Sequence, residues 1–345
     1  MNVSIIGAAG EVGRCIATQL LQSGLLSPSD RLQLIGHGVD GTERKVLAER
    51  CDLLDGFHER APRIETAGTP DDVAGDVIVM TAGATVSHEI QSRRDLAAVN
   101  RPIFERFATA LARQGTGREV VVVVTNPVEL GVEIFSRHLD RRRVLGMGAN
   151  QDSLRFARAV ADDAGVRRGD VHAWVCGEHG EGQVPLWSSV QILGKTPAHA
   201  AALRGVDRKA NFLDEITHHK QHMYALLSAE RIRDAFDLVE GLPPDLRVVL
   251  EPFITAHCLH STPNATANAT CDVIRALSSG RESVIAAQVR LDGEFLGLQS
   301  VAGLPVLANA AGWSQVVCPP LSDTERAHLL DVAATIEANL AQWLA

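Results

Sequence analysis

The sequence has few cysteines, and none of them are placed as a pair that would hold a metal or exchange electrons. The six cysteines in 345 residues contain no CxxC spacing. This excludes a zinc ribbon and a thioredoxin-like redox motif, and we expect free thiols in a reducing compartment, the cytoplasm. His218 and His222 stand four residues apart, as zinc ligands can, but no third ligand is evident. We therefore expect a solvated helix face there and no metal site.

Long apolar segments are also absent. No apolar run approaches the ~20 residues that a membrane span requires. The N-terminal segment MNVSIIGAAG is apolar, but it lacks the basic region and the length of a secretory signal. The sequence thus predicts a soluble protein that has no membrane partner.

Positive charge is scarce relative to negative charge. The chain has 33 Lys and Arg against 42 Asp and Glu, a formal net charge of −9. This balance argues against nucleic acid as a partner, because a polyanion needs a basic surface. If the ligand is a small anion, it must be bound by a few placed cations and backbone N–H groups.

What the sequence does contain is a regular alternation of strand-like and helix-like segments. Helix-length patterns at 12–23, 91–114 and 127–138 lie between short, nearly all-apolar runs, which occur at 2–6, 32–35, 77–80, 120–124 and 143–147. Such runs are typical of strands buried on both faces of a parallel sheet. The alternation predicts a doubly wound α/β domain in the first half of the chain.

The second half has a different pattern. We expect helices at 150–164, 206–239 and 264–279, and strands at 171–176, 184–193, 284–291 and 301–308. Gly-containing turns between the later strands indicate an α+β region with antiparallel pairing. Ser322 and Glu325 form a capping-box pattern at the start of a final helix.

A glycine-rich turn follows the first predicted strand and opens a helix. In GAAGEVG, Gly7 permits a tight turn, Gly10 lets the backbone approach a pyrophosphate, and Gly13 allows close packing of helix on strand. The N–H groups of the first helical turn, at Glu11 and Val12, then face an anion. In this strand–turn–helix context the motif predicts a dinucleotide site.

The next predicted strand ends without the acidic residue that normally binds the ribose of NAD. Gly36 occupies that position, and His37 follows it. With Arg44 and Lys45 nearby, the pattern slightly favours NADP. The alternative is that Asp40 reaches back and the cofactor is plain NAD.

Polar residues with catalytic chemistry lie at the ends of other segments. His179 stands between glycines beyond a predicted strand, and histidine exchanges protons readily near neutral pH. Asp152 and Arg155 share a helix face, where an aspartate can orient an imidazole and an arginine can clamp a carboxylate. A local ion pair between these two is the simpler interpretation. Asn126 follows the five-valine run, at the carboxyl end of a predicted strand, where open α/β sheets bind ligands.

Taken in order, these segments resemble the lactate/malate dehydrogenase family. The resemblance covers nearly the whole chain: SIIGAAGEVG, TAGA, RDLAAVN, VTNPVE, RVLGMGANQDSLRF, GEHGEGQVPLWS and LDGEFLGLQSVAGLPV. It implies a Rossmann domain over 1–149, an α+β substrate domain over 150–345, and a homodimer or homotetramer. The implied activity is NAD(P)-dependent interconversion of a small 2-hydroxy acid and its 2-oxo acid, malate-like first.

The resemblance also implies roles for individual residues. His179 would be the acid–base group, Asp152 would orient it, Arg155 would hold the substrate carboxylate, and Arg93 would polarise the carbonyl. Further substrate contacts would come from Asn126 and Thr262. The residues implied at the cofactor are Gly7, Gly10, Glu11, Val12, Gly13, Gly36, His37, Thr81, Ala82, Gly83, Asn100, Val124, Asn126 and Thr266.

One segment departs from the family pattern. Between Gly83 and Arg93 the chain reads ATVSHEIQS, one residue longer than usual, with Ser87 or Val86 where malate enzymes place an arginine. Loss of one charge-assisted contact of about 1.5–3 kcal/mol would disfavour oxaloacetate roughly 10- to 100-fold. His88 or Arg94 would then have to compensate. The alternatives are a reductase for an unusual 2-oxo acid and a non-catalytic dinucleotide-binding protein.

Overall fold

The computed structural model describes residues 1–36, 42–85, 92–203, 212–259 and 261–345. The elements of the first half are β1 (Asn2–Ile6), α1 (Glu11–Gln22), β2 (Arg31–Ile35), α2 (Thr42–Phe57), β3 (Arg63–Ala67), β4 (Val77–Met80), α3 (Arg93–Gln114), β5 (Val120–Val123), α4 (Val128–His138) and β6 (Val144–Gly146). Those of the second half are α5 (Gly148–Ala164), β7 (Val171–Gly177), β8 (Gln183–Ile192), α6 (Pro197–Leu203), α7 (Phe212–Ser228), α8 (Ile232–Glu240), α9 (Pro244–Leu259), α10 (Pro263–Ser278), β9 (Ser283–Arg290), β10 (Val301–Asn309), β11 (Gly312–Val316) and α11 (Asp323–Leu344).

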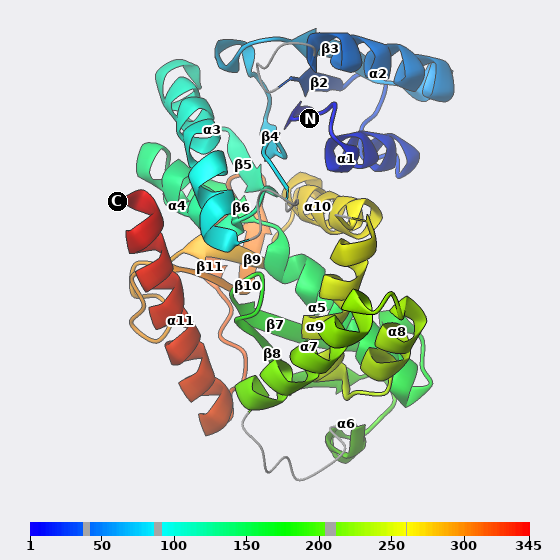
Figure 1. Ribbon diagram of the computed structural model, residues 1–345. Coiled ribbons are helices and arrows are strands. Elements are labelled where there is room, and N and C mark those ends of the chain that lie inside the picture. The colour runs from blue at the N-terminus through cyan, green and yellow to red at the C-terminus, as the bar shows by residue number, and fades with distance from the viewer. Residues whose placement is uncertain (37–41, 86–91, 204–211, 260) are drawn as a thin grey trace.

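The first half is the predicted doubly wound parallel sheet. Its strands lie in the order β3-β2-β1-β4-β5-β6, and each adjacent pair is parallel. All four residues of β4 and of β5 are buried, as expected for strands covered on both faces. The order reverses between β1 and β4, so the crossovers through α1 and α2 and those through α3 and α4 cover opposite faces (Figure 1). Ligands of such sheets bind at the carboxyl ends of the strands at this point.

The second half extends the same sheet with antiparallel strands. β6 pairs with β9 through Gly146 and Gln288, and β9, β10, β7 and β8 follow in order, with β11 paired to β10. The pairs among these later strands are antiparallel, as the turn pattern predicted. A separate apolar cluster joins α5, β7 and β8 to α7, α8 and α9. The division into domains at residue 149, which falls in the first turn of α5, stays a prediction.

The predicted long helix over 206–239 is wrong in its middle. α7 ends at Ser228 and α8 begins at Ile232, so two helices occupy the described part of this range. The chain turns at Glu230, whose φ is 56°, and the N–H groups of residues 229–231 donate to carbonyls in the last turn of α7. This hydrogen bonding closes the helix without glycine or proline, the usual signals for a helix end.

The final helix begins as its cap pattern predicted. Ser322 Oγ accepts a hydrogen bond from the Glu325 backbone N–H, and the Glu325 carboxylate accepts one from the Ser322 N–H. α11 then packs along the sheet and ends near α3 and α4 (Figure 1). Within the described ranges, none of the helices combines the length and the apolar character needed to cross a membrane.

Candidate active site

The glycine turn after β1 has the geometry that its spacing predicted. Gly7 has a φ of +87°, and a Cβ placed on it would lie 2.6 Å from the backbone nitrogen of Ala82. A Cβ on Gly13 would lie 2.5 Å from the Gly7 carbonyl oxygen. Both positions therefore require glycine, Gly7 for its backbone angle and Gly13 for close packing of α1 on the turn.

This turn presents the start of α1 to the carboxyl edge of the sheet. Gly10 occupies the N-cap position and has no side chain with which to cap the first N–H groups, including those of Glu11 and Val12. These N–H groups and the positive end of the helix dipole are suited to an anion. The backbone turn thus fits the pyrophosphate of a dinucleotide.

The segment after β4 lies directly against this turn. Thr81 donates to the Ile6 carbonyl through both its backbone N–H, at 2.9 Å, and its hydroxyl, at 2.7 Å. Ala82 and Gly83 follow, with Ala82 packed on Gly7. The predicted cofactor residues from β1 and β4 are therefore adjacent across the point where the strand order reverses.

Asn100 is a buried clamp between backbone segments. It is fully buried in α3, its Oδ1 accepts from the Ala84 N–H at 2.7 Å, and its Nδ2 donates to the carbonyls of Ala84 and Asn126 at 3.1 and 2.7 Å. Its amide therefore holds the loops after β4 and β5 in place. Val124 continues β5, and the Asn126 side chain is exposed at the carboxyl edge.

The segment after β2 is described only in part. Gly36 is buried, and a Cβ on it would lie 3.0 Å from Thr42 Oγ1 at the start of α2. Arg44 and Lys45 are exposed in the first turn of α2. His37 and Asp40 lie outside the described residues, so the prediction about the ribose end stays a prediction.

The second half contributes a compact group of charged side chains around His179. His179 lies in the loop between β7 and β8, and its Nδ1 is 2.7 Å from Asp152 Oδ2. Asp152 is 1% exposed, and its other oxygen, Oδ1, accepts from Arg155 Nη1 at 3.2 Å. Asp152 and Arg155 thus form a local ion pair, and the same carboxylate contacts the imidazole of His179. The catalytic roles expected of these residues stay predictions.

Arg155 also contacts a polar network between α5 and the start of α10. Its Nη2 donates to Thr262 Oγ1 at 3.2 Å, and Gln151 Nε2 donates to the same oxygen at 3.1 Å. Thr266 is 3.3 Å from both Thr262 and Gln151. Thr266 thus lies in the network beside Arg155. Gln151 was missed from the sequence, although it directly precedes Asp152.

Arg93 joins this group from the start of α3. Its Nη2 lies 3.1 Å from Glu129 Oε2, and its Nη1 lies 2.6 Å from Glu178 Oε1. Burial raises the pKa of Glu129, the charge of Arg93 opposes this rise, and the charge of Glu178 adds to it. Neither glutamate was singled out from the sequence, although each stands in a quoted motif, NPVE and GEHG.

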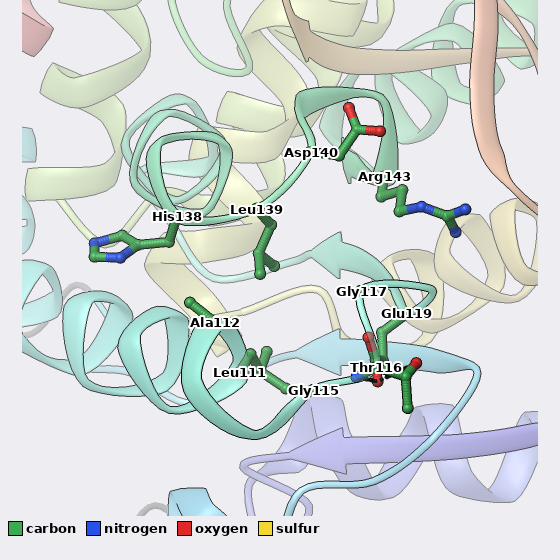
Figure 2. A pocket seen from close by; sticks show the side chains of 10 residues that line it. All are labelled: Leu111, Ala112, Gly115, Thr116, Gly117, Glu119, His138, Leu139, Asp140 and Arg143. Carbon is green, nitrogen blue, oxygen red and sulfur yellow. Dashed lines mark hydrogen bonds between the residues drawn. The ribbon is translucent and has the colours of Figure 1, made fainter.

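The predicted specificity residues Ser87, Val86 and His88 are not among the described residues, so the predictions about them stay predictions. The pocket in Figure 2, of about 420 Å³, is formed by the ends of α3 and α4 and the segments that lead into β5 and β6, so it faces the amino edge of the sheet. In the part of the chain that the structure describes, no group of three potential His, Cys, Asp or Glu ligands could hold a metal ion.

A doubly wound sheet with this glycine turn, and an aspartate-paired histidine on the adjoining half, define a nicotinamide-dinucleotide oxidoreductase as the class of protein. The family description "lactate/malate dehydrogenase, NAD binding domain" matches residues 1–146. The malate dehydrogenase of Haloferax volcanii is 30% identical over 340 residues, which cover 96% of each chain. The L-lactate dehydrogenase of Gloeobacter violaceus is 27% identical, over 98% of this chain and 92% of its own.

A solved structure agrees at the level of the fold. The malate dehydrogenase of Plasmodium falciparum superposes with a TM-score of 0.78 at 19% identity, covering 100% of this chain and 98% of the other. The chain belongs to the lactate/malate dehydrogenase family. It is an oxidoreductase that has an NAD-binding domain and interconverts a 2-hydroxy acid and a 2-oxo acid.

Proposed function

We propose that the substrate pair is malate and oxaloacetate or a close analogue. The observation that carries this proposal is the group formed by His179, Asp152 and Arg155, in which one buried carboxylate contacts both an imidazole and a guanidinium. A 2-oxo acid presents a carbonyl and a carboxylate on adjacent carbons, which such a group complements. The name of the H. volcanii relative supports the malate-like choice.

His179 is the proposed acid–base residue. Its Nδ1–H donates to Asp152, which leaves Nε2 to give a proton to the carbonyl oxygen in reduction and to take it back in oxidation. Asp152 fixes this tautomer and stabilises the imidazolium. Because Asp152 is buried, its charge acts on the ring with little screening by water.

Two arginines divide the charges of the substrate. Arg155 is proposed to hold the C1 carboxylate, since its planar guanidinium suits a two-bond contact and Thr262 fixes its other edge. Arg93 is proposed to stabilise the negative charge that develops on the carbonyl oxygen. Asn126, exposed at the end of β5, is proposed to contact both the substrate and the nicotinamide ribose.

The backbone of the first half is proposed to hold the cofactor. The bound nicotinamide supplies or accepts the hydride, while the turn from Gly7 to Gly13 binds the pyrophosphate and Thr81–Gly83 flank it. The absence of an acid at Gly36 and the exposed Arg44 and Lys45 favour NADP over NAD. Asp40 remains the residue that would reverse this preference.

A second candidate is a reductase for a 2-oxo acid with a neutral side chain. The sequence favours it because Ser87 or Val86 stands where malate enzymes carry an arginine. An uncharged side chain at this position would not compensate for the burial of a second substrate carboxylate. The two candidates share every residue of the His179 group and differ only in this loop.

A matrix of activities separates these proposals. The purified chain would be assayed with oxaloacetate, pyruvate and longer neutral 2-oxo acids, each with NADH and NADPH. We expect the highest kcat/KM for oxaloacetate with NADPH. A preference for a neutral 2-oxo acid would select the second candidate. If no 2-oxo acid is turned over by protein that binds the cofactor, the chain is a non-catalytic dinucleotide-binding protein.

Two further proposals concern the oligomeric state and the cellular location. We infer a homodimer or homotetramer. Size-exclusion chromatography with light scattering would test this by measuring the molar mass. We also infer a cytoplasmic location, from the reducing compartment that the scattered cysteines favour, and cell fractionation would test it.

A further inference from the structure

Glu129 is a buried carboxylate that joins two parts of the site. It is the second residue of α4, it is 1% exposed, and its carboxylate faces the loop between β7 and β8. Oε1 accepts a hydrogen bond from the His179 backbone N–H at 2.7 Å, and Oε2 lies 3.1 Å from Arg93 Nη2. One side chain thus links the loop that carries His179 to the guanidinium on α3.

The other edge of the Arg93 guanidinium is held in the same loop. Arg93 Nη1 lies 2.6 Å from Glu178 Oε1, and Glu178 Oε2 accepts from the Gly182 N–H at 3.0 Å. A Cβ on Gly180 would overlap Arg93 Nη1, so a larger residue there would require the guanidinium to shift. One cation therefore lies between two carboxylates and against the loop backbone.

The arrangement repeats the contact that Asp152 makes on the other side of His179. Asp152 links the His179 ring to Arg155, and Glu129 links the His179 backbone to Arg93. Each arginine is therefore connected to the histidine through one buried carboxylate. The sequence gives no sign of this symmetry, because the carboxylates belong to different helices, α5 and α4.

Burying a carboxylate costs free energy unless charges and hydrogen bonds compensate for it. In Glu129 both oxygens are engaged, and the carboxylate lies in the first turn of α4, where the helix dipole favours negative charge. The contact with Arg93 compensates the buried charge of Glu129. The same contact fixes the guanidinium relative to the loop, because Glu129 also accepts from the His179 N–H.

We infer that Glu129 is a positioning residue that fixes Arg93 relative to His179. The guanidinium charge of Arg93 and the proton of His179 then act on the same carbonyl oxygen. The inference rests on the proposed roles of Arg93 and His179 and deepens them. Arg93 polarises the carbonyl from one side, and His179 protonates it from another. Both act in the transition state, so their separation matters for kcat more than for substrate binding.

The test uses E129Q in the full-length protein, with E133Q as a matched control. Glutamine keeps an oxygen to accept from the His179 N–H, but it removes the negative charge that faces Arg93. Glu133 is one turn further along α4, is also buried, and pairs with arginines of its own, Arg137 and Arg290. Steady-state kinetics and thermal melting would be measured for both variants.

We expect E129Q to lower kcat roughly tenfold, with KM for the 2-oxo acid within about threefold of wild type. E133Q should leave both constants near the wild-type values. In an R93Q background, E129Q should cause no further loss of kcat, because the group that it positions is gone. Equal effects of E129Q in both backgrounds would overturn the inference, as would a wild-type kcat in folded E129Q.

Two results keep this inference separate from the proposed function. If wild-type protein turns over no 2-oxo acid, the proposed function fails before any variant is compared. If wild type is active and E129Q matches it, only the role of Glu129 fails. Should E129Q not fold, E178Q releases the other edge of Arg93, and its effect should likewise vanish in the R93Q background.

Discussion

The two halves of the proposed site would recognise their ligands by different means. In the turn after β1, recognition falls to backbone N–H groups, and side chains are excluded because Cβ atoms at Gly7 and Gly13 would collide with the chain. In the group around His179, recognition falls to charged side chains held by buried carboxylates. A protein of net charge −9 can therefore bind two anions, one through dipoles and one through two placed arginines.

This difference makes the two halves separable by mutation. A substitution in the glycine turn should change the affinity for cofactor, and a substitution near His179 should change turnover or substrate affinity. H179N, R155K and G13A test whether cofactor binding and turnover can be changed independently.

The largest effect is expected for H179N. Asparagine can still donate to Asp152, but it cannot give up a proton, so kcat should fall by about 10²- to 10⁴-fold. The dissociation constant of the reduced cofactor, measured by its fluorescence, should stay near the wild-type value. H172N is the matched control, because His172 is exposed on β7, the strand that leads into the loop of His179. Unchanged turnover in H179N would show that the acid–base assignment is wrong, and lost cofactor binding would show that the halves are not separable.

A smaller effect is expected for R155K. Lysine keeps the charge, but it loses the fork that contacts Asp152 and Thr262 and is proposed to bind a carboxylate by two bonds. KM for the 2-oxo acid should rise roughly 10- to 100-fold with a smaller change in kcat.

The control for this variant is R158K. Arg158 lies on the same helix, α5, and pairs with Glu251 on α9, away from His179. It should keep the wild-type KM. A wild-type KM in R155K would remove Arg155 from the substrate site and leave the Asp152 contact as a local ion pair.

Most of the first half was predictable because its signals are local. The strand, turn and helix around Gly7 follow from consecutive residues, since Gly7 is needed for its positive φ and Gly13 for its close contact with the Gly7 carbonyl. Strand β3 was missed because RIETA lies at the edge of the sheet and only Ile64 in it is buried. An edge strand has too little apolar character to stand out from its neighbours.

The contacts around His179 could be predicted only through resemblance and spacing. The pairing of Asp152 with His179 joins residues 27 apart, and the pairings of Glu129 with Arg93 and His179 join residues 36 and 50 apart. Such contacts are set by how α3, α4 and the loop after β7 meet, which no local pattern reports. The break between α7 and α8 was missed for a related reason, because backbone hydrogen bonds close it without a breaker residue.

The smallest effect is expected for G13A, which probes the half that uses backbone alone. The added Cβ would lie 2.5 Å from the Gly7 carbonyl oxygen, so the turn or α1 must shift, and the N–H groups move away from the pyrophosphate. The dissociation constant of the cofactor should rise about tenfold, by analogy with the loss of one hydrogen bond to a charged group. At saturating cofactor, kcat and KM for the 2-oxo acid should stay near the wild-type values.

The matched control for G13A is G56A. Gly56 lies in α2 with open space around it, so alanine there should leave binding unchanged and melting the same or slightly higher. If G13A lowers kcat at saturating cofactor as strongly as it weakens cofactor binding, the turn also helps to place the nicotinamide against the substrate. The backbone half would then take part in the chemistry that is proposed for the side chains around His179.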